Sequence, residues 1–306
     1  MKTAFRLLLA SLLLIGAASL VEAQNPEVTH NTWTSGAPMP TPVYYPATGV
    51  LKSEIYIVGG GVTYTSYTAD TQIYNAATNT WSTGTSLPSP TIAAAGAVVK
   101  NILYVIGGYG TAASNAVWAY SPKTKTWSAQ ADMPTARYGA VPVVEKNIIY
   151  VMGGQDNNGD LLTTVESYNP ATNTWTEEAP LLVAKTQFQA ALVGTSIVAP
   201  DGLINVSSNT GDNEGYDATT NTWTSLTADP TARAGTCAGA VGTEMYVAGG
   251  YSTGTTSLTE SFELSKNAWN TLAAMPQPTL LPGSAVYKKK LYCFGGITTY
   301  LSLIHI

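Results

Sequence analysis

Three positively charged side chains occupy one repeated position in this chain. Arg137, Lys185 and Arg233 follow one another at intervals of 48 residues. Arginine and lysine bind carboxylates and other anions, whereas the faces of tyrosine rings pack on sugar rings. Tyrosines and amide side chains come shortly after this position and also follow several glycine pairs. This chemistry predicts a site for a polyhydroxylated or anionic ligand.

The candidate ligand-binding residues are Arg137, Lys185, Arg233, Tyr44, Tyr109, Tyr138, Gln155, Asp156 and Tyr251. A structural role for the three cations is the alternative. Arg137 ends the sequence Met-Pro-Thr-Ala-Arg, which is part of the repeat, and an arginine there can hold adjacent loops by donating to backbone carbonyls. The sequence leaves both interpretations open.

The residue types do not supply a recognisable catalytic set. The two histidines are His30 and His305, so a Ser-His-Asp triad has no suitable base. The segment 156–160 offers oxygen ligands, but its glycine comes too early for a calcium loop of the EF-hand type. We therefore assign no catalytic residue and expect no metal and no other cofactor.

Glycine pairs and tryptophans recur together and define the elements that must position the candidate residues. The pairs are Gly59-Gly60, Gly107-Gly108, Gly153-Gly154, Gly249-Gly250 and Gly295-Gly296, with Asp201-Gly202 in the one vacancy. The recurring tryptophans are Trp33, Trp81, Trp127, Trp175, Trp223 and Trp269. Both series advance by 48, 46, 48, 48 and 46 residues, which indicates one supersecondary unit copied six times.

Each copy is predicted to contain four short strands. In the second copy, the small-residue segment 93–99 turns at 100–101 into the apolar run 102–106, which ends at a glycine pair. Strands at 117–120 and 126–128 follow. Four short strands with glycine and aromatic punctuation are typical of a propeller blade. In that arrangement, Trp127 and Trp175 are expected to be buried between neighbouring blades.

The glycine pairs, the aromatic residue seven positions before each tryptophan from the second onward, and the turn at 169–175 resemble the kelch motif. The resemblance extends from about Asn31 to Tyr300. It implies an all-β fold, a six-bladed kelch β-propeller with four-stranded blades that is closed by an N-terminal strand carrying Trp33. The loops before each inner strand and after each glycine pair would then emerge on one face, where a ligand would bind over the propeller axis.

Two functions are compatible with this resemblance. The first is a non-catalytic binding or interaction protein, whose ligand is a carbohydrate, a small anionic molecule or a peptide. The alternative is a metal-free sugar-active enzyme such as a sialic acid mutarotase, for which Asp156 with Arg137 is the nearest acid-base pair. Galactose oxidase, a copper enzyme among the exported kelch propellers, needs histidine ligands that this chain lacks almost entirely.

The N-terminus has the pattern of a secretory signal peptide over residues 1–23. A basic start is followed by an apolar run at 7–20 and by small residues at Val21 and Ala23. The apolar run is shorter than the ~20 residues that span a membrane. We therefore expect a secreted or periplasmic protein that begins at Gln24 and has no membrane span after cleavage.

Composition narrows the possible partners. Charged residues make up 11% of the chain and the net charge is −5, which argues against nucleic-acid binding. The one basic run, Lys288 to Lys290, is predicted to be a solvated turn. Cys237 and Cys293 fall on different kinds of strand, so we expect buried free thiols, with a disulfide as the alternative that export would permit.

The last six residues, 301–306, correspond to the translation of a transposon-end adaptor used in sequencing libraries. We expect this segment to be an artefact, so that the propeller covers residues 24–300 and six blades is a lower bound. A native strand is the alternative, because six apolar-rich residues can pair as one.

Overall fold

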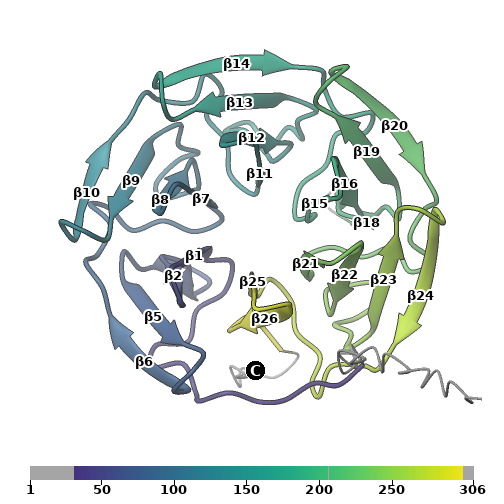
Figure 1. The fold of residues 1–306 in the computed structure, drawn as a ribbon, viewed down its shortest axis with the longest axis horizontal. Coiled ribbons are helices and arrows are strands. Elements are labelled where there is room, and N and C mark those ends of the chain that lie inside the picture. Colours follow the sequence, from purple (N-terminus) through teal and green to yellow (C-terminus); the bar gives the residue numbers. More distant parts are fainter. Residues whose placement is uncertain (1–30, 206, 299–306) are drawn as a thin grey trace, which may run out of the picture. The chain divides into compact units, whose positions relative to one another are not determined.

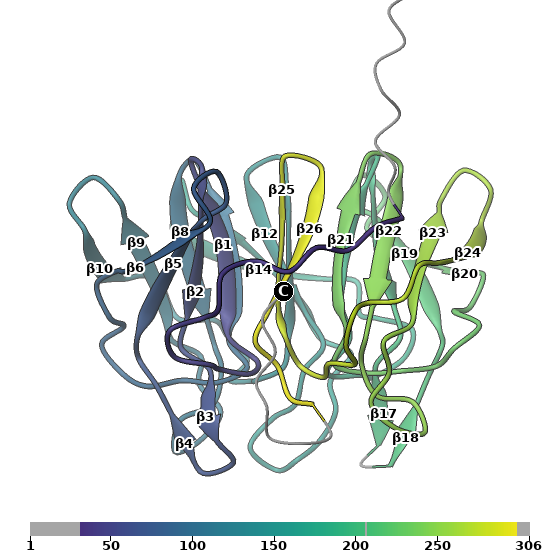
Figure 2. The same ribbon diagram turned by 90° about the horizontal axis from the view of Figure 1, so that it is seen from below.

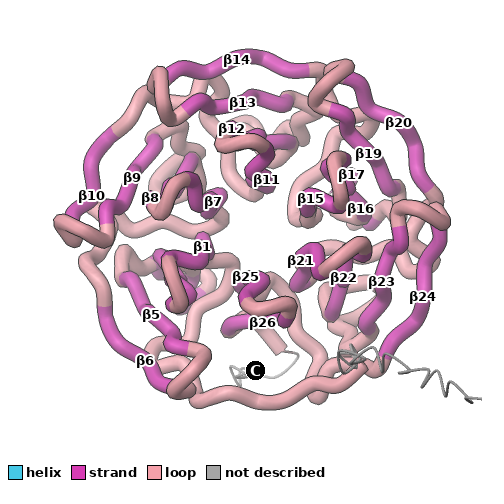
Figure 3. The backbone as a smooth tube through the Cα atoms, viewed as in Figure 1, coloured by secondary structure: helices cyan, strands magenta, loops and turns pink. Residues whose placement is uncertain are grey.

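The computed structural model describes residues 31–205 and 207–298. The chain divides into a short unit, Met1–Thr32, and a larger unit, Trp33–Ile306, and the following description concerns the larger one. The predicted signal peptide and the segment 301–306 lie outside the described residues. The described part consists of strands joined by turns and loops (Figure 3). It includes no helix that is long and apolar enough to cross a membrane.

Five four-stranded antiparallel sheets form consecutive blades around a ring (Figure 1). The first blade contains β1 (Ala47–Leu51), β2 (Glu54–Val58), β5 (Thr71–Asn75) and β6 (Thr80–Thr83). The second contains β7 (Ala95–Val99), β8 (Ile102–Ile106), β9 (Val117–Ser121) and β10 (Thr126–Ala129). The third contains β11 (Val141–Glu145), β12 (Ile148–Met152), β13 (Val165–Asn169) and β14 (Thr174–Glu178). The fourth contains β15 (Ala191–Val193), β16 (Ser196–Pro200), β19 (Asn213–Asp217) and β20 (Thr222–Leu226). The fifth contains β21 (Cys237–Val241), β22 (Glu244–Ala248), β23 (Thr259–Glu263) and β24 (Ala268–Leu272).

Three two-stranded sheets complete the described part. β25 (Gly283–Tyr287) and β26 (Lys290–Phe294) lie in the ring between the fifth and first blades (Figure 1). Two small hairpins are formed by β3 (Gly61–Thr63) with β4 (Ser66–Tyr67) and by β17 (Leu203–Asn205) with β18 (Ser208–Asn209). The prediction of an all-β propeller with four-stranded antiparallel blades is confirmed, with five such blades among the described residues.

The two ends of the ring differ in their connections (Figure 2). One end, the turn face, holds the short turns that join the first strand to the second and the third to the fourth in each blade. The other end, the loop face, holds the connections after the glycine pairs and the loops that enter each new blade. The hairpins β3–β4 and β17–β18 project from the loop face.

The glycine pairs join each sector of the ring to the next one. The N–H of the second residue of each pair donates to a carbonyl in the neighbouring sector: Gly60 to Thr91, Gly108 to Arg137, Gly154 to Lys185, Gly202 to Arg233, Gly250 to Thr279 and Gly296 to Val43. At Gly107 φ is +65°, and a Cβ would lie 2.6 Å from the Arg137 carbonyl oxygen. A side chain would therefore force the two sectors apart, yet Asp201 occupies the equivalent position with φ +64°.

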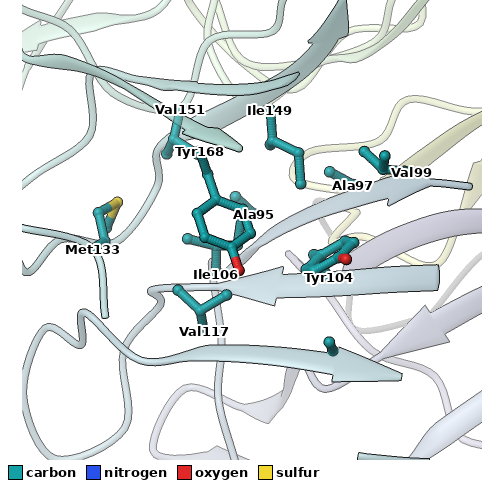
Figure 4. Packing of buried hydrophobic residues seen from close by; sticks show 11 residues of the cluster. Ala95, Ala97, Val99, Tyr104, Ile106, Val117, Met133, Ile149, Val151 and Tyr168 are labelled. Atoms are coloured by element: carbon teal, nitrogen blue, oxygen red, sulfur yellow. The ribbon is translucent and has the colours of Figure 1, made fainter. Parts of the chain in front are cut away.

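Apolar clusters fill the contacts between successive sectors. The cluster between the second and third blades contains Tyr104 and Ile106 of β8 and Ile149, Val151 and Tyr168 of the third blade. Figure 4 shows the Tyr168 ring lying among these side chains. Small residues on the innermost strands allow close approach, since a Cβ at Gly96 would collide with the backbone of Thr48. Burial of this apolar surface is the main stabilising term of the fold.

The repeated tryptophans from Trp81 onward lie on the outer strands. All six are only partly buried, except for Trp223 at 9% exposure. Trp175 is paired directly with Tyr168 across β13 and β14, with ring centroids 5.0 Å apart. Its Nε1 donates to the Ala131 carbonyl at 2.9 Å, in the loop that leaves the second blade. Trp127 is likewise half-buried. The expectation that Trp127 and Trp175 are buried between blades was wrong, because one side of each outer strand faces solvent.

Cys237 of β21 and Cys293 of β26 form a disulfide, with their Cα atoms 5.8 Å apart. The expectation of free thiols was wrong. The two residues belong to different kinds of strand, but β21 and the β25–β26 sheet are neighbours in the ring, which brings their side chains together. The bridge ties the fifth blade to the β25–β26 sheet.

Candidate functional site

The loop face carries the candidate site, and one short β-bridge recurs around it. In each sector a residue entering the blade pairs with the residue after the glycine pair. The paired residues are Tyr44 with Gly61, Ile92 with Tyr109, Tyr138 with Gln155, Thr186 with Leu203, Ala234 with Tyr251, and Leu280 with Ile297. Candidate residues from both loop types are therefore brought to the same level of the ring, as the sequence predicted.

A row of tyrosines lies over the first three blades. We define the tyrosine row as Tyr44, Tyr64, Tyr67, Tyr109 and Tyr138. The ring centroids of Tyr67 and Tyr109 are 6.2 Å apart, and those of Tyr109 and Tyr138 are 5.2 Å apart. Tyr44 and Tyr64 are 6.4 Å apart. Tyr64 is 74% exposed, whereas the other four rings are partly buried.

Polar contacts fix the third-blade end of the tyrosine row. The Tyr138 hydroxyl donates to Gln155 Oε1 at 2.8 Å, and Gln155 Nε2 donates to the Gly159 carbonyl at 2.7 Å. Burial raises the pKa of Tyr138, and the neighbouring Tyr109 and Asp156 raise it further. Tyr138 therefore remains a neutral hydroxyl at any physiological pH.

Asp156 caps the loop beside Tyr138. Its Oδ1 accepts hydrogen bonds from the backbone N–H groups of Asn158 at 2.8 Å and Asp160 at 2.9 Å. Hydrogen bonds from the backbone of Asp160 and then Asn158 lower the pKa of Asp156, because they stabilise the charged form. Asp156 is held as an oriented carboxylate at the surface. Among the described residues, no cluster of histidine, cysteine and acidic side chains is arranged to hold a metal.

The three candidate cations lie in the interior. The side chains of Arg137, Lys185 and Arg233 are fully buried. Arg137 Nη2 pairs with Glu166 at 2.7 Å, and its Nη1 donates to the Thr164 carbonyl at 2.8 Å. This arrangement favours the structural alternative, in which these cations hold parts of the scaffold together. The loop that carries each cation directs its side chain beneath the face toward the third strand of the same blade.

Lys185 repeats the arrangement in the fourth blade. Its Nζ lies 3.1 Å from Glu214 Oε1 and donates to the Ala199 carbonyl at 2.7 Å. The ammonium group also lies 5.2 Å from the centroid of the Phe188 ring. Burial lowers the pKa of Lys185, and Glu214 opposes that shift. Burial likewise lowers the pKa of Arg137 to about 10, with Glu166 opposing, so this side chain stays charged at neutral pH.

Arg233 is surrounded by carboxyl groups. Its Nη2 contacts Glu260 and also Asp229, the latter at 3.2 Å, and its Nε lies 3.9 Å from Asp201. Burial and then Asp229 raise the pKa of Asp201 well above its usual range. Burial also raises the pKa of Glu260 to about 7. This group holds more carboxyl groups than cations, so it retains protons that the same side chains would lose in water.

The sequence contains a second regular spacing that could have predicted these pairs. Each partner glutamate follows its cation by 27 or 29 residues: Glu166 follows Arg137, Glu214 follows Lys185 and Glu260 follows Arg233. Co-occurrence at a nearly constant interval is typical of residues that meet within one repeat. Tyr67 and Asp201 were also missed, because neither stands at a position that repeats its residue type.

The propeller axis is obstructed at the loop face. Backbone N–H groups donate around the axis from Tyr45 to Leu281, Ala93 to Tyr45, Gly139 to Ala93, Gly235 to Gln187 and Leu281 to Gly235. In the part of the chain that the structure describes, no backbone bond of this kind joins Gln187 to Gly139. The Tyr45 side chain reaches across to this gap, and its hydroxyl is hydrogen-bonded to Thr186 and to the backbone of Gln187.

A cavity of about 150 Å³ lies along the axis against Tyr45. Its other polar lining side chains include Thr48, Gln189 and Ser284. Pockets for drug-sized ligands measure about 300–1,000 Å³. The axial cavity is therefore too small for an oligosaccharide or a peptide, and the open surface of the loop face is the better candidate site.

Asp156 and Arg137 do not form the acid-base pair that a mutarotase would need. Arg137 is buried against Glu166, whereas Asp156 caps a surface loop. The remaining candidates, Tyr44, Tyr109, Tyr138, Gln155, Asp156 and Tyr251, all lie on the loop face.

The chain is similar to kelch proteins over most of its length. A family model described as the KLHDC2/KLHL20/DRC7 Kelch-repeats domain matches residues 128–296, and the kelch motif matches residues 42–88 and 90–134. No curated protein sequence matches the chain. A solved structure titled "Structure of YjhT" is similar with a TM-score of 0.80 at 18% identity, over 89% of this chain and 96% of the other. The chain belongs to the kelch-repeat family.

Proposed function

We propose that this chain is an exported kelch propeller that binds a partner on its loop face and catalyses no reaction. The observation that carries the proposal is the distribution of exposed large apolar side chains. Among the described residues these are Val62, Tyr64, Leu182, Ile204 and Tyr251. All five lie in connections of the loop face. Apolar side chains gathered on one face favour an interaction surface.

The chemistry of this surface favours a carbohydrate or a peptide as the ligand. Tyrosine rings offer broad faces, and Gln155 and its neighbours offer hydrogen-bonding groups beside them. An anionic ligand is less favoured, because the cations that were expected to bind it do not reach this surface. The described cations are either buried, as Arg137, Lys185 and Arg233 are, or located on the turn face.

We also infer that the ring has six blades, the sixth built from β25, β26 and the N-terminal segment with Trp33. Trp33 Nε1 donates to the Ala273 carbonyl at 3.0 Å. Trp81, Trp175 and Trp223 make the same bond to a carbonyl 44 residues away, in the sector before their own. Trp33 therefore occupies the place of a fourth strand beyond the fifth blade. The bond from Gly296 to Val43 supports closure at the same point.

Export rests on the N-terminal sequence pattern and on the disulfide between Cys237 and Cys293, since disulfides persist in oxidising compartments. Intact-mass measurement of the secreted protein tests this part. A mass that begins at Gln24 and includes the disulfide is expected, whereas retention of residues 1–23 contradicts export.

Binding is tested by calorimetry of the mature protein against panels of oligosaccharides and peptides, followed by variants. Tyr109→Ala and Tyr64→Ala are expected to weaken a detected ligand by about tenfold each, the loss of one aromatic contact. Tyr287→Ala, at the end of β25 on the turn face, is the matched control and is expected to leave affinity unchanged. Loss of binding only in the control would overturn the proposal.

The alternative, a metal-free sialic acid mutarotase, has lost the acid-base pair that the sequence suggested. NMR spectra of sialic acid anomers with the mature protein separate the two functions. We expect interconversion no faster than in buffer. Catalysed interconversion would replace the binding proposal.

A further inference from the structure

The exposed cations of the described residues lie on one face of the propeller. Nine lysines among the described residues are not buried inside a blade: Lys52, Lys100, Lys123, Lys125, Lys146, Lys266, Lys288, Lys289 and Lys290. Each lies at or beside a short turn of the turn face. The loop face instead presents Asp70, Asp132, Asp156, Asp160 and Asp212, which are exposed or partly exposed. Figure 2 shows the two faces at opposite ends of the ring.

We infer that the loop face binds a cationic polypeptide segment, with the tyrosine row and the aspartates beside it as the contact surface. This inference rests on the proposed function and names the class of partner. Carboxylates and aromatic faces together attract lysine and arginine side chains, through Coulomb attraction and through cation-π contact. The aspartates repel an anionic sugar, and no described cation is exposed on this face to attract one.

Asp156 supplies the clearest carboxylate for such a contact. It accepts hydrogen bonds from the backbone N–H groups of Asn158 and Asp160 and from the Asn158 side chain. None of these is a cation, so the negative charge is uncompensated by the protein. The carboxylate lies beside Tyr138, at one end of the tyrosine row. A cation of the ligand bound there would contact both the Asp156 carboxylate and the Tyr138 ring at the end of the tyrosine row.

The spacing of the rings favours an extended chain over a small cation. Tyr67, Tyr109 and Tyr138 follow one another at centroid separations of 6.2 and 5.2 Å. Alternate side chains of an extended peptide lie about 7 Å apart on one side, at about 3.3 Å per residue. Successive side chains on one side of a bound segment can therefore meet successive rings, with Asp156 at the third-blade end.

The experiment uses three synthetic peptides with serine alternating with lysine, glutamine or glutamate, together with a neutral cello-oligosaccharide. Affinities for the mature protein are measured by calorimetry at about 50 and about 500 mM salt, which changes screening strongly. The lysine peptide is expected to bind at least about tenfold more tightly than the glutamine peptide, and the difference in affinity from the glutamate peptide is expected to be larger still. The affinity of the lysine peptide is expected to fall at high salt.

Two isosteric variants form a matched pair. Asp156→Asn removes a loop-face carboxylate and is expected to weaken the lysine peptide about fivefold. Asp217→Asn removes an exposed turn-face carboxylate that also caps a turn, through the N–H of Thr219, and is expected to change nothing. Both carboxylates cap a loop or turn at the surface, so thermal unfolding of each variant is measured alongside to check that the fold is retained.

Three results would overturn the inference. One is no detectable binding of the lysine peptide, and another is an equal effect of Asp217→Asn. The third is oligosaccharide binding that is insensitive to salt and to Asp156→Asn but is lost in Tyr109→Ala. That last result leaves the proposed loop-face binding function intact. A ligand whose binding ignores every loop-face variant would overturn both.

Discussion

The first blade and the third to fifth blades fill the same structural slot with different chemistry. In the first blade, the Gln72 side chain donates to the Thr41 carbonyl at 2.7 Å and accepts from the Thr41 N–H at 2.9 Å. In the third, Arg137 pairs with Glu166. Gln72 and Glu166 hold equivalent positions in β5 and β13. In the first blade, a neutral amide at this position of the third strand makes the contact with the entering loop. In the third blade, a charged glutamate occupies the same position, so a propeller blade does not require a charge there.

This comparison explains why three evenly spaced cations are poor evidence for a ligand. The side chain at this position connects the entering loop to the third strand of the blade. Because this side chain is buried, its polar atoms need hydrogen-bond partners. A buried arginine also needs a carboxylate nearby, because its charge would otherwise be uncompensated. The repeated cation therefore indicates a structural contact inside the blade. The side chains that a partner can reach lie above it, on the loop face.

The largest effect is expected where one cation holds several carboxyl groups. Arg233→Met leaves Glu260, Asp229 and Asp201 without their counter-charge. We expect a loss of about 3–5 kcal/mol in the free energy of unfolding, measured by chemical denaturation. Thr91→Ala, at the equivalent neutral position of the second blade, is the control and should cost less than about 1 kcal/mol. Similar losses in both would remove the distinction between the blades.

Asp201→Gly tests the excess of carboxyl groups in the fourth and fifth blades. The pKa of Asp201 is raised, and that of Glu260 is raised to about 7, so the native state holds protons that the unfolded chain has released. Stability is then greatest below the unfolded pKa values and declines as pH rises from about 4 toward 7.

Asp201→Gly removes one of these groups and restores the glycine found at the other pairs. We expect it to stabilise the protein by about 1–3 kcal/mol at neutral pH, because a buried carboxyl without hydrogen-bond partners is removed. Denaturation at several pH values checks both statements. A steeper decline with pH in the variant would contradict the account.

The outer tryptophans should not distinguish the two regions. Trp81 in the first blade and Trp175 in the third are both half-buried, and each donates a bond to the sector before it. We expect Trp81→Ala and Trp175→Ala to cost about 2 kcal/mol each, less than full burial would give. Thermal unfolding of both variants is the measurement. A difference above about 2 kcal/mol would show that the blades differ in more than the buried slot.

The smallest effect is expected at the neutral slot itself. Gln72→Ala removes two hydrogen bonds to Thr41 but leaves no charge unpaired. We expect a cost of about 1–2 kcal/mol by denaturation, in line with ordinary hydrogen bonds. A loss as large as that of Arg233→Met would mean that the contact between the entering loop and the third strand determines the free energy of unfolding, whether or not it is charged.

The fold was predictable because its signals repeat. Glycine pairs such as Gly107-Gly108 recur where the backbone approaches the next sector, and the Tyr168-Trp175 type of pair recurs at the same interval. The site was only partly predictable. The spacing predicted that Arg137 and Tyr138 lie at one level of the ring, but it could not predict which way their side chains point. In the structure the Arg137 side chain is buried, whereas Tyr138 belongs to the tyrosine row on the loop face.

Contacts between sectors also escaped the sequence analysis. The Cys237–Cys293 bridge joins neighbours whose adjacency depends on how the ring closes. Tyr45 fills a gap beside Gln187, across the axis. Neither contact repeats, so neither has a period that could reveal it.

A double-mutant cycle on Arg137 and Glu166 tests the central claim most directly, because it measures whether the repeated cation belongs to the scaffold. The variants are Arg137→Leu, Glu166→Leu and the pair together, each followed by chemical denaturation. We predict that each single change costs about 3–5 kcal/mol and that the double variant recovers at least about 2 kcal/mol of the summed loss. A coupling energy below about 0.5 kcal/mol, with Arg137→Leu as stable as the parent protein, would contradict the account and return the cation to a ligand-binding role.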